Sequence, residues 1–228
     1  MAINFSWFYK LTKPLNRILN KNGQAYNLTM LNPIKKDHAD ALRTTLAKIP
    51  VVDVDSPLAN FPLTHFARFN VIDSLPFVGA PALYDHLQNQ YLVFSCVFDT
   101  GNTNWRSVES DLDAYLKQMF EAMPTEINSI WGHCVDFPEP LTLSAFQDFV
   151  KKYQIGGGFF FADYPNNTAE EARRALFEQK QFIDFVIKAQ EISDHAQLKA
   201  DFYQFSKNLA DAPTPPPGSI FTSSVVKE

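Results

Sequence analysis

The chain lacks most of the features from which a function is usually recognised. Only two of its 228 residues are cysteines, and no CxxC pair or zinc-type Cys/His spacing occurs, which argues against a disulfide framework or a zinc site. Walker, GxSxG and HExxH sequences are absent as well. No apolar run approaches the roughly 20 residues that cross a bilayer. Without a secretory signal, these absences predict a cytoplasmic protein in a reducing compartment and name no reaction.

Positive charge is scarce overall but concentrated at the start of the chain. The net charge is −5, although the first 36 residues carry six Lys and Arg residues and no acid. The acidic balance of the rest argues against a nucleic-acid partner, because phosphate contacts need clustered cations. Apolar residues make up 46% of the chain, and Phe alone contributes 21. This composition predicts a large aromatic core or, alternatively, an apolar ligand cavity.

Residues 1–24 form a basic amphipathic segment. Its candidate membrane-contact residues are Phe5, Trp7, Phe8, Lys10, Lys13 and Arg17. Aromatic residues interleaved with cations suit a peripheral contact with a membrane surface. The alternative is an N-terminal arm that packs on its own domain or on a partner subunit.

Residues 25–136 predict an α+β core. Alternating or β-branched runs indicate strands at 25–32, 64–73, 91–99 and 127–135. Helical spacing of apolar residues indicates helices at 37–49 and 107–123. The resulting order is βαββαβ, the ferredoxin-like arrangement of one antiparallel sheet with helices on one face.

Residues 137–210 predict a helical extension packed on the core, and residues 211–228 a flexible Pro-rich tail. One helix ends at Tyr153, before three glycines. Thr168 and Glu171 form a capping box for a long helix to about residue 190, whose last turns are apolar all round and should be buried. Asp194 caps a final helix.

The side of the sheet away from the helices has an unusual mixture of residues. Alternation places apolar residues such as Phe94 and Cys96 on the helix side. The opposite side then carries the candidate ligand-binding residues Thr29, Phe66, Asn70, Tyr91, Ser95 and Trp131, together with Arg68 and His133. Thr64 is assigned to the same open face. Such a half-polar, half-apolar surface suits a pocket or a subunit interface.

The strand and helix order and this mixed open face resemble the dimeric α+β-barrel superfamily. The resemblance covers roughly residues 24–136. It implies two ferredoxin-like units packed sheet to sheet, as in small monooxygenases, EthD-like proteins, chlorite dismutases and dye-decolorizing peroxidases. The GxxDG motif of the last group is absent, so no catalytic residue is carried over.

These observations lead to three hypotheses. The first is a protein that binds a small apolar or amphipathic ligand, an acyl lipid or haem, over the open face. The second is an oxidoreductase, haem peroxidase-like or cofactor-free monooxygenase-like, with Arg68 and His133 as catalytic residues. The third is a non-catalytic interaction domain whose open face is a homodimer interface. No metal site is expected apart from His133, which would be the iron ligand if haem is bound.

The four other histidines and both cysteines have less specific expectations. His65 is expected to lie at the rim of the open face, and His38, His86 and His195 to be solvated. Cys96 and Cys134 should be buried neutral thiols on the helix side.

Overall fold

The computed structural model describes residues 19–50, 54–74, 79, 87–156 and 158–219. The predicted membrane-contact residues Phe5, Trp7, Phe8, Lys10, Lys13 and Arg17 lie outside the described residues. No helix in the described part of the chain is both long enough and apolar enough to span a membrane.

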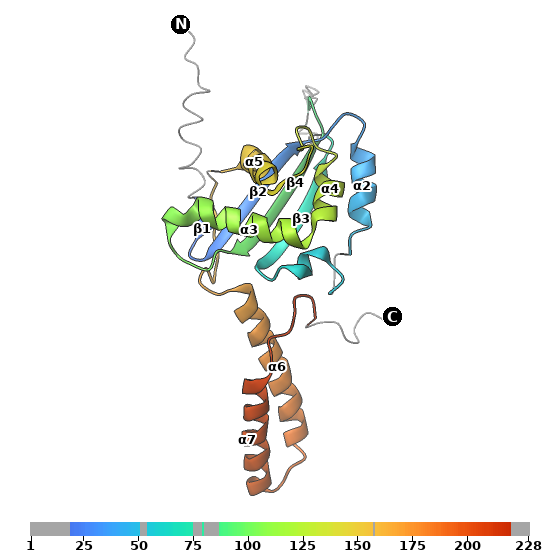
Figure 1. The fold of residues 1–228 in the computed structure, drawn as a ribbon. Coiled ribbons are helices and arrows are strands. Elements are labelled where there is room, and N and C mark those ends of the chain that lie inside the picture. The colour runs from blue at the N-terminus through green and yellow to red at the C-terminus, as the bar shows by residue number, and fades with distance from the viewer. Residues whose placement is uncertain (1–18, 51–53, 75–78, 80–86, 157, 220–228) are drawn as a thin grey trace.

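Three long antiparallel strands form the centre of the sheet (Figure 1). They are β2 (Ala25–Pro33), β3 (Thr64–Ile72) and β4 (Tyr91–Asp99), with β4 in the middle. Two short strands, β1 (Lys21–Asn22) and β5 (Gln154–Ile155), pair with the free edge of β2. The fold is therefore α+β with a five-stranded antiparallel sheet, and the three long strands confirm the strands predicted for these segments.

The fourth predicted strand, at residues 127–135, is wrong. The segment is mostly helix α4 (Pro124–Trp131), and only Cys134 makes a single bridge to Ile34. Pro124 occupies the first helical position, which its fixed φ favours. Ile127 and Ile130 are fully buried on one face of the helix. The ferredoxin-like strand order is consequently not confirmed, because β1 and β5 occupy the edge of β2.

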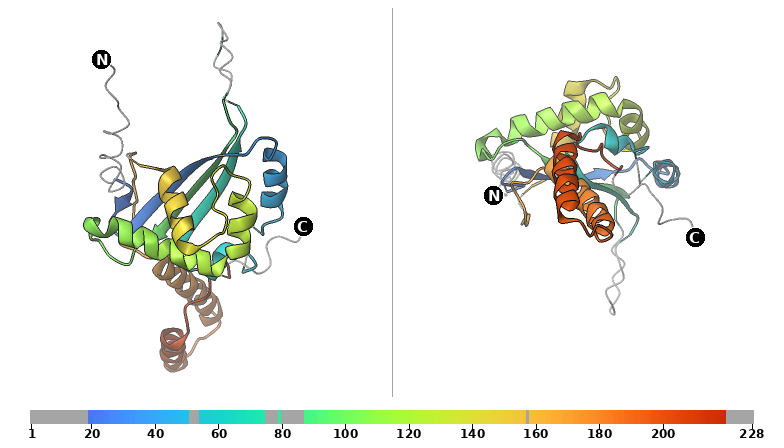
Figure 2. Two further views of the ribbon diagram at one scale, coloured as in Figure 1. Left: turned by 45° about the horizontal axis from the view of Figure 1, so that its top comes forward. Right: turned by 90° about the horizontal axis from the view of Figure 1, so that it is seen from below.

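One face of the sheet is covered by helices (Figure 1 and Figure 2, left). They are α3 (Val108–Ala122), α4 and α5 (Leu143–Tyr153), while α2 (Ala39–Ala47) lies at the β3 edge and contacts α4. The strand residues facing them, including Leu28, Met30, Phe94 and Cys96, are buried. The predicted helix side of the sheet is thus confirmed by burial. Two short 3-10 helices, η1 (Pro57–Asn60) and η2 (Trp105–Ser107), precede β3 and α3.

The last two helices form a hairpin that projects beyond one end of the sheet (Figure 1). Helix α6 (Ala169–Ala189) begins at the predicted capping box, and α7 (His195–Asp211) begins at Asp194 as predicted. The expectation that the last turns of α6 are buried is wrong, since Ile187 is 59% exposed. Helices α6 and α7 pack on each other through Phe185 and Phe205, whose rings stack at 4.6 Å, so the apolar residues on their outer sides face solvent.

Candidate functional site

The open face of the sheet contains the predicted row of polar side chains. Ser95 is paired with Thr29 on one side and with Arg68 on the other, and the Thr29 and Ser95 hydroxyls are 3.4 Å apart. Asn70 and Tyr91 lie further along the same face, because they share the alternation phase of Arg68 and Ser95. The register therefore brings together Thr29, Phe66, Arg68, Asn70, Tyr91 and Ser95.

Trp131, in contrast, does not lie on the open face. It is fully buried in α4, and its ring packs against Phe94 and Phe146 with centroid distances of 5.2 and 6.0 Å. The expected position was wrong because the segment is a helix on the other side of the sheet.

His133 is also displaced from the predicted site. It follows α4, its carbonyl accepts from the Lys35 amide, and its Nδ1 lies 3.0 Å from Nδ1 of His38. His38, expected to be solvated, is thus its ring partner. Arg68 and His133 consequently do not flank a common ligand position. The two acidic residues nearest to the ends of β3 and β4 have other partners, since Asp73 pairs with Arg43 and Asp99 with His65.

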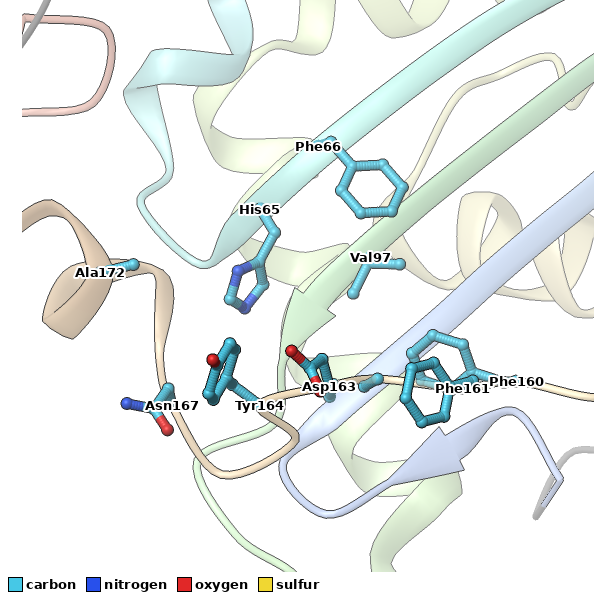
Figure 3. Close-up of a pocket in the computed structure, with 11 residues that line it drawn as sticks. His65, Phe66, Val97, Phe160, Phe161, Asp163, Tyr164, Asn167 and Ala172 are labelled. Atoms are coloured by element: carbon cyan, nitrogen blue, oxygen red, sulfur yellow. The ribbon is translucent and has the colours of Figure 1, made fainter.

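A cavity of about 570 Å³ opens on the face that carries Phe66 (Figure 3). Its floor comes from the sheet, its opposite wall from the loop before α6, and its end from the first turn of α6. The lining residues are Ala25, His65, Phe66, Val97, Phe160, Phe161, Ala162, Asp163, Tyr164, Asn167 and Ala172. Most of them are apolar, so the cavity favours an apolar occupant with a small polar part.

A β-bulge positions His65 at this cavity. The pairing of β3 with β4 shifts between Thr64 and Phe66. Thr64, assigned to the open face from alternation, instead bonds the buried Tyr115 hydroxyl on the helix side at 2.9 Å. The extra residue is His65, which lines the cavity. Bulges commonly redirect a side chain in this way.

Asp99 holds the imidazole and the start of α6 together. Its Oδ1 accepts from His65 Nε2 at 2.7 Å, and its Oδ2 accepts from the Ala169 amide at 2.7 Å. The carboxyl is buried, with the residue only 4% exposed. Through this one side chain the end of β4 fixes both a polar wall residue and the helix that closes the cavity.

A second cavity of about 450 Å³ lies beyond His65. It is lined by Ser56, Leu58, Ala59, Thr64, His65, Phe66, Ala67, Ala169, Ala172, Arg173, Leu176, Pro217 and Gly218. His65, Phe66 and Ala172 line both cavities, so the two meet at these residues. Sequence reasoning missed Asp99, Phe160, Phe161 and Arg173, because each belongs to a strand end, a loop or a helix with no local signal of a site.

The other reactive groups lie elsewhere and are not activated. Burial raises the pKa of both cysteine thiols, Cys96 and Cys134, to about 12, so both are the neutral buried thiols expected from sequence. Among the described residues, no group of three or more His, Cys, Asp or Glu side chains could hold a metal ion.

Comparison with known proteins assigns no family. No protein-family model matches the chain, and neither the curated proteins nor the solved structures give a significant match. The fold and the cavity define an α+β protein with an antiparallel sheet and an apolar cavity on the face opposite its helices.

The histidine pair predicts a pH dependence of stability. Burial, followed by the charges of His38 and Lys35, lowers the pKa of His133 below its ordinary value. The unfolded chain therefore takes up a proton at this residue before the folded chain does, so stability falls as the pH drops below about 6.5.

We expect His133→Gln to lose less stability than the natural sequence between about pH 7.5 and 5.5, as measured by urea unfolding. His195→Gln, which changes an exposed residue, is the control and should follow the natural sequence. An equal loss in His133→Gln and the natural sequence would contradict this prediction.

Proposed function

We propose that this protein binds a small apolar or amphipathic ligand over the open face of its sheet. The observation that carries this proposal is the cavity of about 570 Å³ between Phe66, Val97 and the loop with Phe160 and Phe161. This volume lies in the range of about 300–1,000 Å³ typical of small-molecule sites. An aromatic and aliphatic wall with a few polar groups suits ligands that bury a hydrocarbon part.

Exposure of the lining supports the same proposal. Phe66 is 61% exposed on the edge strand β3, next to the bulge. A large apolar side chain held open beside a cavity gains free energy when a ligand covers it, at about 25 cal/mol per Å² of apolar surface. The ligand classes predicted from sequence were acyl lipids and haem. An acyl chain suits the apolar lining. His133, the predicted haem ligand, does not line the cavity, and Nε2 of His65 is already bonded to Asp99.

The relation to dimeric α+β-barrel proteins remains a proposal. It is supported by the order of the three long strands, in which the first and second in sequence flank the third. The oxidoreductase alternative has less support, because His133 follows helix α4 and does not stand on the strand from which it was predicted to face Arg68. The homodimer and the peripheral membrane contact through the N-terminal segment stay predictions.

We expect Phe66→Asp to weaken binding of the neutral apolar fluorophore N-phenyl-1-naphthylamine at least about tenfold. The substitution puts a charge into the apolar wall, while the exposed position should keep the change in unfolding free energy within about 1 kcal/mol. Fluorescence titration measures the affinity, and urea unfolding checks the stability. Mass spectrometry of lipids extracted from the purified protein then identifies natural ligands.

Tyr203→Asp is the matched control, because it introduces the same charge at an exposed aromatic residue of α7 that lines neither cavity. It should bind the fluorophore as the natural sequence does. Equal affinity in Phe66→Asp and the natural sequence would place the fluorophore elsewhere, such as between α6 and α7, and would refute the proposed site.

A further inference from the structure

Arg173 presents an unused hydrogen-bond donor beside the second cavity. Its Nη1 donates to the Pro62 carbonyl at 3.2 Å. Its Nε is withdrawn from solvent and has no hydrogen-bond partner among the described residues. A buried donor without an acceptor is costly, and almost all such groups in proteins are paired. A ligand acceptor in this cavity would remove that cost if the Arg173 side chain turned its Nε toward the ligand.

The two cavities carry opposite charges. Asp163 is the one charged side chain among the described residues that line the first cavity, apart from the titratable His65. In the second cavity, Arg173 is the one charged side chain among the described lining residues, again apart from His65. Because the cavities meet at His65, Phe66 and Ala172, a ligand that spans both experiences a negative end and a positive end. An anionic group is repelled by Asp163 and attracted by Arg173.

The aromatic side chains are also divided unequally between the two cavities. Phe160, Phe161, Val97 and Ala25 all belong to the first cavity, so a hydrocarbon chain is best accommodated there. A guanidinium matches a carboxylate particularly well, because its planar donors form charge-assisted hydrogen bonds with both oxygens. A single Arg balances one negative charge, and the carboxylates of Asp99 and Glu170, which interact electrostatically with it, weaken the binding of any anion and oppose a doubly charged head group most.

We propose that the ligand is a carboxylate-headed amphiphile, with its head group on Arg173 and its chain in the first cavity against Phe160 and Phe161. This inference rests on the proposed function and adds the chemical class and the orientation of the ligand. Asp163 and Arg173 then act as specificity-determining residues at opposite ends of one site.

The experiment compares decanoate, decanol and decylamine, which share a chain length and differ in head group. Each displaces N-phenyl-1-naphthylamine from the full-length protein in a fluorescence titration. Decanoate should bind about tenfold more tightly than decanol, because it adds a charge-assisted hydrogen bond. Decylamine should gain no affinity from Arg173. Arg173→Gln should lower the affinity for decanoate to that for decanol and leave the affinity for decanol unchanged.

Two further variants keep the result interpretable. Lys180→Gln removes the same charge from an exposed position of the same helix and should keep the preference for decanoate. Arg173→Lys retains the charge and should keep part of the preference for decanoate. Equal binding of decanoate and decanol by the natural sequence, or equal loss of both in Arg173→Gln, would overturn this inference and leave the proposed function intact. Failure of the fluorophore and all three ligands to bind would overturn the proposed function itself.

Discussion

Trp131→Ala should lower the free energy of unfolding by about 3–5 kcal/mol, the loss typical when a large buried aromatic side chain is truncated. The indole is fully buried, and its ring contacts Phe69, Phe94 and Phe146 at centroid distances of 5.5, 5.2 and 6.0 Å. Alanine leaves a space between α4, α5 and the sheet that rigid neighbours fill only in part. Urea unfolding followed by circular dichroism measures the loss.

This experiment also tests the assignment of residues 124–131 to a helix. On the open face, where the sequence placed it, Trp131 would be partly solvated and its removal would cost far less. The control is Trp105→Ala, which changes a 54% exposed residue and should cost less than about 1 kcal/mol. A loss as small as that of the control for Trp131→Ala would contradict the buried position.

Asp111→Ala is the second substitution expected to have a large effect, about 3–5 kcal/mol, because it leaves a buried cation without its partner. Lys21 Nζ lies 2.7 Å from Asp111 Oδ2, and the two side chains are only 3% and 7% exposed. Ser107 Oγ and Asn102 Nδ2 also donate to this carboxylate, at 2.7 and 2.9 Å. The pair therefore fastens β1 to the start of α3.

The double variant Lys21→Met with Asp111→Leu separates the cost of an unpaired charge from the value of the pair. It should recover most of the stability lost in Asp111→Ala, because neither remaining side chain is charged. Glu121→Ala breaks the exposed pair between Lys117 and Glu121 and should change stability by less than about 1 kcal/mol. A loss in Asp111→Ala no larger than that in Glu121→Ala would show that the Lys21–Asp111 pair is hydrated.

The sequence misled at α4 for a physical reason. Ile127, Ile130 and Trp131 are apolar in a short segment, and a short apolar run fits a buried strand as well as a buried helix. Pro124 directly follows the helix predicted at 107–123, and it is also the first residue of α4. Its second role, as the first residue of a new helix, together with the i, i+3, i+4 spacing of these three residues, was the signal that could have identified α4.

Some features of the candidate site could be predicted from the sequence, and others could not. Arg68, Ser95 and Thr29 were correctly predicted to share a face, because alternation along a strand depends only on neighbouring residues. His65 at the cavity could not be predicted, because it depends on a bulge in the pairing with β4. Arg173 follows the start of α6, where the Ala169 amide donates to the Asp99 carboxylate 70 residues earlier in the sequence, so its position at the cavity depends on a contact between distant segments.

By itself the sequence determined the three long strands, the side of each strand that is buried, and the caps of α6 and α7. These features depend on period, propensity and capping, which act over a few residues. The tertiary structure alone decided that α4 replaces the expected strand, that His65 bonds to Asp99, and that the loop before α6 encloses a cavity over Phe66. These outcomes depend on contacts between segments that are far apart in the sequence. Such contacts form only when the chain has packed, so local sequence patterns do not determine them.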